Sequence, residues 1–167
     1  MIRCLNNKRP VIHPSVYVNE AAYVVGDVEL AEDVTVWPCA VLRGEGMIKI
    51  GRDTHVQDGS ILHASKRAEI GSHINIGHSV VIHDVIIGDY CLIGNNSTLL
   101  SQVEIGHHCV VAANAMIRQG TKIPPYSFVV GVPADVRPLN DKQKLRFGDG
   151  VTRGFIDLAK QYKSAGL

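Results

Sequence analysis

Three histidines in an otherwise apolar part of the chain have side chains that could bind a metal ion. His78 and His83 lie five residues apart in IGHSVVIHD, and His63 precedes them in GSILH. Imidazole nitrogens are common zinc ligands, and three of them leave a fourth position open for water, as in catalytic zinc sites. Fe2+, Co2+ and Ni2+ accept the same ligands, so the residue types do not identify the metal. Whether the three rings can meet depends on the elements that carry them.

An aliphatic residue recurs at every sixth position through most of the chain. Two-residue insertions interrupt this repeat before Ile50 and Ile70, and one residue is missing before Ile87. A period of six fits neither a helix nor a hairpin sandwich, but it fits a β-solenoid in which each unit forms a short strand and a corner. We therefore expect a solenoid over about residues 11–134. The twenty repeated positions are Ile12, Val18, Val24, Leu30, Val36, Leu42, Ile50, Val56, Leu62, Ile70, Ile76, Ile82, Ile87, Ile93, Leu99, Ile105, Val111, Ile117, Ile123 and Val129.

This repeat resembles that of the hexapeptide-repeat superfamily. The resemblance implies an all-β solenoid, a left-handed parallel β-helix of triangular section with three units in each coil. Twenty units would then form six to seven coils. We expect residues 1–138 to form this β-helix domain with a short N-terminal lead-in, and residues 139–167 to form a C-terminal helical segment.

The C-terminal segment carries the signals of an amphipathic helix that packs along the β-helix or on a neighbouring subunit. Asn140 and Gln143 match a capping box at a helix N-terminus. Gly148, Gly150 and Gly154 weaken the middle of the segment, so it forms either one helix or two. The apolar residues at helical spacing are Phe155, Leu158, Ala159 and Tyr162.

Three units in each coil place equivalent residues of every third unit side by side, at the inter-strand distance of about 4.8 Å. Arg43, His63 and His83 each follow the inward aliphatic residue of equivalent units. Side chains alternate along a strand, so these three residues form one outward column, the first column.

A second column of side chains follows the same rule on a different face. Asp58, His78 and Asn95 are the third residues of equivalent units, and Gln57 lies alongside. Columns on adjacent faces of a convex prism diverge, so one chain cannot bring His78 to the first column. Packing the first column of one copy against the second column of the next would join them, and a cyclic homotrimer would close that contact.

Three segments, AVLRGEG, VQDGSILH and IGHSVVIH, resemble motifs of the gamma-class carbonic anhydrases and their gamma-carbonic-anhydrase-like relatives. The likeness covers about residues 10–138. It implies a homotrimer that hydrates carbon dioxide reversibly to bicarbonate. It also implies a zinc ion at each subunit interface, held by His63 and His83 of one subunit and by His78 of the next.

The same resemblance gives roles to the polar residues around the predicted metal ligands. Arg43 would pair with an acidic residue across the interface, and Asp58 is the candidate. Gln57 would orient the reacting hydroxide or the incoming carbon dioxide. Each of these residues has a simpler alternative: the histidines are polar interface residues without metal, Arg43 and Asp58 form an interface salt bridge, and Gln57 is a polar surface residue.

The chain departs from the family pattern in three places. Glu45 stands where relatives usually have aspartate, and Asn95 where they often have methionine. The best-studied members carry an acidic loop with a proton-shuttling glutamate after the first metal histidine, whereas this chain has only ASKRAE, with Lys66 and Arg67. The metal ligands are unaffected, but proton transfer lacks its usual acid. Glu45 is the candidate that could replace it.

Two other functions stay open. The fold also hosts many CoA-dependent acyltransferases, so an acyl-CoA thioesterase or acyltransferase is the first alternative. Transfer needs only one catalytic histidine and would leave the pairing of His63 with His83 unexplained. The second alternative is a catalytically weak or inactive metal-binding trimer, which the short ASKRAE loop favours.

Charge and composition exclude several classes of function. The net charge of +1 gives no attraction to nucleic acid or anionic membranes, and the 5% aromatic content gives few stacking surfaces. MIRCLNNKRP lacks the apolar run of a signal peptide, no stretch could span a bilayer, and the four cysteines lack CxxC spacing. We therefore expect a cytoplasmic protein with a small-molecule substrate and no nucleic-acid or membrane partner.

Some residues that could carry chemistry have simpler interpretations. Cys91 and Cys109 occupy the same inward position one coil apart, so we expect buried thiols and no disulfide. Asp84 has no role beyond a polar surface or a contact to a metal ligand. The remaining histidines are expected to be solvated: His13, His55, His73, His107 and His108.

Overall fold

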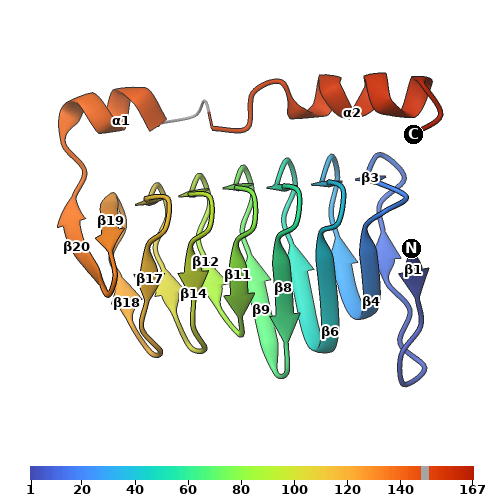
Figure 1. Cartoon of the computed structure of the whole chain (residues 1–167), viewed down its shortest axis with the longest axis horizontal. Helices are drawn as coiled ribbons and strands as arrows, with labels where there is room; N and C mark the ends of the chain where they lie inside the picture. Colours follow the sequence, from blue (N-terminus) through green and yellow to red (C-terminus); the bar gives the residue numbers. More distant parts are fainter. Residues whose placement is uncertain (148–150) are drawn as a thin grey trace.

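The computed structural model describes residues 1–147 and 151–167, and it shows a β-solenoid whose coils stack along one axis (Figure 1). Neighbouring coils pair in parallel, and the solenoid has about seven left-handed turns followed by helices. The predicted fold class is therefore confirmed.

Each coil contributes short strands to three faces, which we number 1 to 3. β4 (Tyr23–Leu30) and β6 (Val41–Ile50) run through both face 1 and face 2, so these faces share one 12-stranded sheet within the described residues. β1 (Ile2–Arg3) pairs with β4 at the N-terminal end. The other strands of face 1 are β8 (Ile61–Ala64), β11 (Val81–His83), β14 (Thr98–Leu99) and β17 (Met116–Ile117). The other strands of face 2 are β2 (Val11–Ile12), β9 (Arg67–Ile70), β12 (Ile86–Ile87), β15 (Glu104–Ile105) and β18 (Lys122–Ile123).

Face 3 is a separate sheet of eight strands within the described residues. Its last two strands pair antiparallel, which ends the solenoid at residue 138. The strands are β3 (Tyr17–Val18), β5 (Thr35–Val36), β7 (His55–Val56), β10 (Asn75–Ile76), β13 (Leu92–Ile93), β16 (Val110–Val111), β19 (Ser127–Gly131) and β20 (Ala134–Pro138).

The repeated aliphatic residues fill the interior as the six-residue period predicts. Leu42, Leu62 and Ile82 are fully buried and pair in register in consecutive coils. Cys91 and Cys109 are buried free thiols, as expected, and the Cys109 backbone N–H donates to the Cys91 Sγ at 3.4 Å. Burying this apolar stack stabilises the solenoid by about 25 cal/mol for each Å2 removed from water.

The C-terminal segment forms two helices, α1 (Asp141–Phe147) and α2 (Phe155–Ser164). The predicted capping box is present, since Asn140 Oδ1 accepts from the Gln143 backbone N–H at 2.9 Å and Gln143 Oε1 accepts from the Asn140 N–H at 2.9 Å. Gly154, directly before α2, has a φ of 87°, which favours glycine. Gly148 and Gly150 lie outside the described residues.

The chain reverses after β20, so that α2 runs back over the first coils of the solenoid (Figure 1). Ala159 is buried there, and the rings of Phe155 and Tyr162 pack against Tyr17 and Trp37 on face 3. The amphipathic helix therefore packs along its own β-helix, one of the two predicted arrangements. Neither helix of the described chain is long and apolar enough to cross a bilayer.

The prediction that His55 is solvated is wrong. Its side chain is fully buried on face 3, where Nδ1 hydrogen-bonds Thr35 Oγ1 at 2.8 Å and Nε2 lies 3.1 Å from Asp53 Oδ1. Phe155 of α2 stacks on the ring at 4.7 Å. Burial lowers the pKa of His55 to about 4, although Asp53 opposes this shift. The six-residue period identifies outward positions, but it does not show which of them a distant helix covers.

Of the other histidines outside the predicted metal site, two are exposed and two are partly covered. His13 and His107 are exposed as expected. His73 and His108 are instead half-buried, because each stacks on the ring of Tyr90, at 4.7 Å and 4.8 Å.

Candidate metal site

The first column forms on face 1 as the repeat predicts. Arg43 of β6 pairs in register with His63 of β8, which pairs with His83 of β11. The two imidazole rings lie with their centroids 4.6 Å apart and their planes at 79°. The His63 side chain is 18% exposed and the His83 side chain 36% exposed, so both rings reach the surface of one chain.

Glu45 joins the first column because β6 bends from face 1 to face 2 directly before it. The bend needs Gly44, since a Cβ at that position would lie 2.6 Å from the Asp27 carbonyl oxygen. Glu45 Oε2 lies 2.8 Å from His63 Nε2, and Oε1 lies 3.3 Å from Arg43 Nη1. Arg43 Nη2 lies 3.1 Å from the same His63 nitrogen. One carboxylate and one guanidinium therefore meet at Nε2 of His63.

The charge around Glu45 favours its ionised form. Slight burial raises the pKa of Glu45, but other contacts outweigh this effect. These contacts are a hydrogen bond from its own backbone N–H, the hydrogen bond with His63, and the charges of Arg43 and His63. The pKa of Glu45 is therefore lowered from its ordinary value.

The His83 ring is held from the next coil. Its Nδ1 hydrogen-bonds Ser101 Oγ at 2.8 Å and lies 3.4 Å from Asp84 Oδ2. Asp84 Oδ1 accepts the backbone N–H groups of Lys66 at 2.9 Å and Arg67 at 3.2 Å. Sequence reasoning left Asp84 as a polar surface residue or a contact to a metal ligand, and the structure places it beside His83. That reasoning missed Ser101, because the register of β11 with β14 aligns Leu100, and not Ser101, with His83.

The second column lies at the corner between faces 3 and 1. His78 Nδ1 is 3.2 Å from Asp58 Oδ2, and the His78 backbone N–H donates to Asn95 Oδ1 at 3.0 Å. The side chains of His78 and Asp58 are 52% and 50% exposed. The imidazole of His78 is therefore open to an approaching surface while its carboxylate partner holds one edge of the ring.

Gln57 is on face 3 and is separate from the histidine pair of its own chain. It is 8% exposed, and its Nε2 donates to Asn75 Oδ1. Within residues 1–147 and 151–167 of one chain, no three His, Cys, Asp or Glu side chains are placed to hold a metal ion. His63, His78 and His83 therefore do not form a three-ligand site within one described chain.

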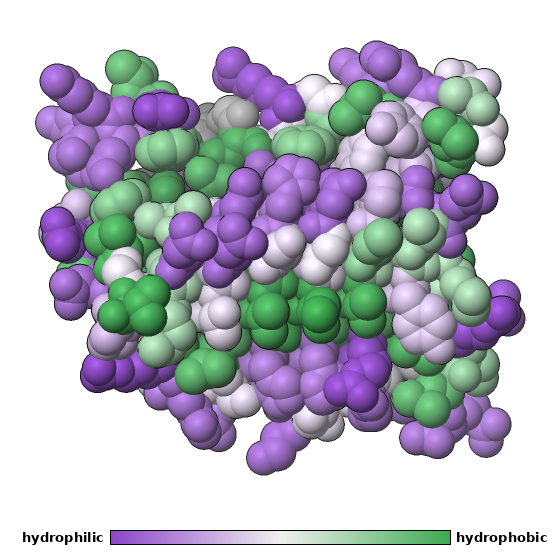
Figure 2. Space-filling model, viewed as in Figure 1, coloured by the Kyte–Doolittle hydropathy of each residue, from purple (hydrophilic) through white to green (hydrophobic). Residues whose placement is uncertain are grey.

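Face 1 has an apolar band beside the first column, visible across the centre of the molecule with hydrophilic side chains on both sides (Figure 2). Its residues are outward partners in consecutive coils, and three of them are exposed large hydrophobics: Tyr23 at 38%, Ile61 at 42% and Val81 at 42%. Exposed apolar bands of this kind commonly mark protein interfaces.

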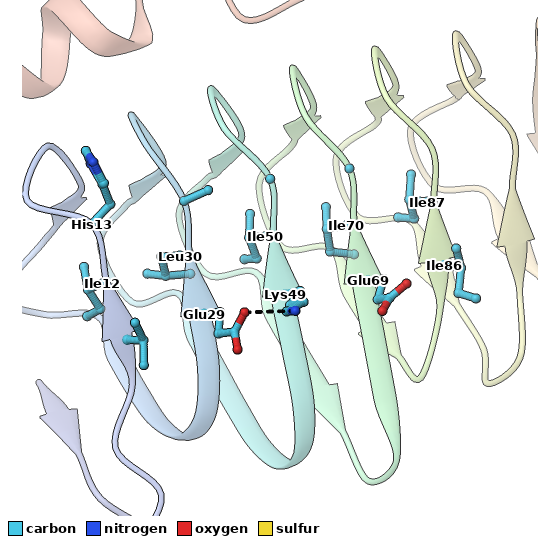
Figure 3. Close-up of a pocket in the computed structure, with 14 residues that line it drawn as sticks. Ile12, His13, Glu29, Leu30, Lys49, Ile50, Glu69, Ile70, Ile86 and Ile87 are labelled. Atoms are coloured by element: carbon cyan, nitrogen blue, oxygen red, sulfur yellow. Dashed lines mark ion pairs between the residues drawn. The ribbon is translucent and has the colours of Figure 1, made fainter.

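A wide groove of about 710 Å3 lies on face 2 and includes none of His63, His78 and His83 in its lining (Figure 3). The ion pair of Glu29 and Lys49, at 3.2 Å, stands along it, and its floor is formed by residues such as Ile50 and Ile70. It contains none of the residues predicted to act in the metal site. The site is therefore defined by side-chain columns and not by this groove.

Comparison with known protein families identifies the repeat. A family model described as Bacterial transferase hexapeptide (six repeats) matches residues 67–101 and 84–119. The chain is 38% identical over 146 residues to Protein YrdA of Escherichia coli (strain K12), covering 81% of this chain and 79% of that protein. It is 32% identical over 168 residues to Gamma carbonic anhydrase 2, mitochondrial, of Arabidopsis thaliana, covering 95% of this chain and 60% of that longer protein.

Solved structures share the architecture. The product of the BC4754 gene of Bacillus cereus aligns with a TM-score of 0.93 and 29% identity, covering 98% of this chain and 97% of that one. The hexapeptide-repeat-containing acetyltransferase VCA0836 of Vibrio cholerae, complexed with acetyl coenzyme A, aligns with a TM-score of 0.61 and 28% identity. That alignment covers 67% of this chain and 71% of the acetyltransferase.

Proposed function

Because this chain belongs to the gamma-carbonic-anhydrase-like family of hexapeptide-repeat proteins, we propose that it hydrates carbon dioxide reversibly to bicarbonate as a homotrimer. One observation carries the proposal. His63 and His83 stand ring beside ring on face 1, while the half-exposed His78 lies at another corner beside Asp58. In a trimer, these positions would supply two ligands to one interface and a third ligand to the next.

The three histidines would hold zinc, which at such a site lowers the pKa of water to about 7 and makes hydroxide available at neutral pH. Fe2+, Co2+ or Ni2+ would suit the same nitrogens. The exposed apolar band on face 1 supports the trimer, because packing it against a neighbouring copy would remove it from water and bring that copy's second column to the first column.

The polar residues complete the reaction. Hydration forms a bond between a water oxygen and the carbon of carbon dioxide and releases one proton. Glu45, beside His63, is the carboxylate that would take this proton and pass it to buffer. Gln57 would orient the reactants, and Arg43 would pair with Asp58 of the neighbouring copy, which fixes the two columns against each other.

Complementation between variants tests the arrangement. His78→Ala and His83→Ala should each abolish zinc binding. Co-expressed in equal amounts, they should recover about one quarter of the sites, since a site is intact when the histidine pair comes from the first variant and His78 from the second. Zinc content and stopped-flow hydration should recover together. His13→Ala, which changes an exposed histidine, is the control. One zinc per subunit in either single variant would contradict the assignment.

An acyl-CoA enzyme is the second candidate, because a solved structure with this architecture is an acetyltransferase complexed with acetyl coenzyme A. A thioesterase could use the same three histidines, whereas a transferase would not need the pair. Turnover of acyl-CoA without hydration of carbon dioxide would favour this class. Turnover that persists after chelation would point to the transferase, and turnover that chelation abolishes would point to the thioesterase.

A catalytically weak metal-binding trimer is the third candidate. The corner between β8 and β9 holds only Ser65 and Lys66, so this corner supplies no acid for proton transfer. Bound zinc without measurable hydration between about pH 6 and 9 would favour it.

A further inference from the structure

Two polar groups meet at the same nitrogen of His83. Ser101, which follows β14 in the next coil, places Oγ 2.8 Å from Nδ1. Asp84 places Oδ2 3.4 Å from that nitrogen. A hydroxyl can accept from a ring N–H or donate to a bare ring nitrogen, whereas a carboxylate can only accept, so Asp84 beside Ser101 favours a proton on Nδ1.

Asp84 is fixed in place and is not a freely rotating surface carboxylate. Its side chain is 13% exposed, and its Oδ1 accepts the backbone N–H groups of Lys66 and Arg67. The backbone of Asp84 itself has a φ of 47°, in the left-handed region, and its N–H donates to the His63 carbonyl oxygen at 3.1 Å. Asp84 therefore links the corner after β8 to the His83 ring.

A proton on Nδ1 leaves the lone pair of His83 on Nε2. In metal sites the nitrogen opposite the metal usually donates to such an acceptor, which fixes both the tautomer and the orientation of the ring. Nε2, on the other side of the ring, lies 3.5 Å from Ser65 Oγ, the limit of a hydrogen bond. Nε2 is thus available while Nδ1 is held.

We propose that Ser101, together with Asp84, is a positioning residue that fixes the Nδ1–H tautomer of His83 and directs Nε2 to the metal. This inference rests on the proposed function only in taking His83 as a ligand. It adds a residue from the coil after that of His83 to the site. Each histidine of the pair then has its own support: Glu45 and Arg43 for His63, and Ser101 and Asp84 for His83.

Ser101→Val and Ser101→Thr form a matched pair of similar shape, in which only Thr keeps the hydroxyl. Zinc affinity, measured by competition with a chromophoric chelator, should fall about 10–100-fold in Ser101→Val and stay within about threefold of the parent in Ser101→Thr. The absorption spectrum of the Co2+-loaded protein should differ from that of the parent in Ser101→Val and stay close to it in Ser101→Thr. Equal affinity in all three proteins would overturn the proposal.

Nitrogen-15 spectra of the metal-free protein give a readout that does not depend on activity. His83 should be Nδ1-protonated in the parent and in Ser101→Thr, with an increased Nε2–H population in Ser101→Val. If Ser101→Val does not assemble, Ser101→Ala is measured in the same way. A parent protein that binds no zinc but keeps this tautomer would refute the proposed zinc site and retain only the assignment of Ser101 and Asp84 as the groups that fix the His83 tautomer. An Nε2–H tautomer in the parent would refute the inference alone.

Discussion

His63 and His83 lie one coil apart with ring centroids 4.6 Å apart, yet they are held from opposite directions. His63 meets Glu45 and Arg43 through Nε2, and both residues lie in the preceding coil. His83 meets Ser101 through Nδ1, in the following coil. The pair is therefore chemically asymmetric, and its two supports can be altered separately.

Replacing Glu45 by Gln should slow hydration without removing the metal. The variant keeps the shape of the side chain but cannot accept a proton as a carboxylate. Hydration in weak buffer should fall roughly 100-fold, recover when imidazole is added, and leave zinc content unchanged. Glu104→Gln is the control, because Glu104 pairs with Lys122 on face 2, at 3.1 Å. An unchanged rate in weak buffer would exclude Glu45 as the proton acceptor.

Replacing Asp58 by Asn should weaken metal binding through His78. Asp58 Oδ2 lies 3.2 Å from His78 Nδ1, and losing this carboxylate reduces the orientation and basicity of the ring. Zinc affinity should fall about 10–100-fold. Asp89→Asn changes another corner carboxylate, which accepts the Ser72 backbone N–H, and should leave affinity unchanged. Equal affinities in the Asp58 and Asp89 variants would show that His78 needs no carboxylate.

Acid should destabilise the protein through His55. Burial lowers its pKa to about 4 in the folded state, from 6.5. The unfolded chain therefore binds more protons between these values, and stability present above about pH 6.5 is lost as the pH falls through 4. The loss is about 3 kcal/mol by pH 4. Urea unfolding at several pH values measures this loss. The protein is kept metal-free, so that release of zinc from the predicted ligands in acid does not add to the effect.

The matched variant for this prediction is His55→Gln, which cannot titrate in that range. It should be less stable than the parent at pH 7.5 and should lose less of its stability between pH 7 and 4. A parent and a variant with the same pH dependence would show that His55 does not carry the effect.

Replacing Thr152 by Val should loosen the C-terminal segment. Thr152 is buried, and its Oγ1 donates to Asp53 Oδ2 at 2.9 Å, the same carboxylate that contacts His55 beneath α2. Hydrogen bonds to charged groups contribute about 1.5–3 kcal/mol. We expect faster hydrogen exchange and proteolysis of α2. Thr121→Val, which removes a hydrogen bond to the Arg118 carbonyl at a distant corner, should not change α2. Equal protection of α2 in both variants would contradict the prediction.

The solenoid and the two columns that carry the three histidines follow from the sequence alone. The period of six places an aliphatic residue inward in every unit, and three units in each coil set the register in which Arg43, His63 and His83 pair. The same rule places His78 between Asp58 and Asn95 at a different corner. These relationships depend only on strand alternation and parallel pairing, which the sequence period encodes directly.

Other contacts depend on how corners bend and where the last helix docks. The bend at Gly44 turns Glu45 to His63, and the corner at Asp84 reaches back to Lys66. The return of α2 along the solenoid buries His55, which the period marks only as outward. The sequence by itself determined the columns, because hydrogen-bonded coils repeat at a fixed spacing. Only the tertiary structure decided which column residues are buried, hydrogen-bonded or exposed to solvent. These differences come from contacts between segments that the repeat does not relate to each other.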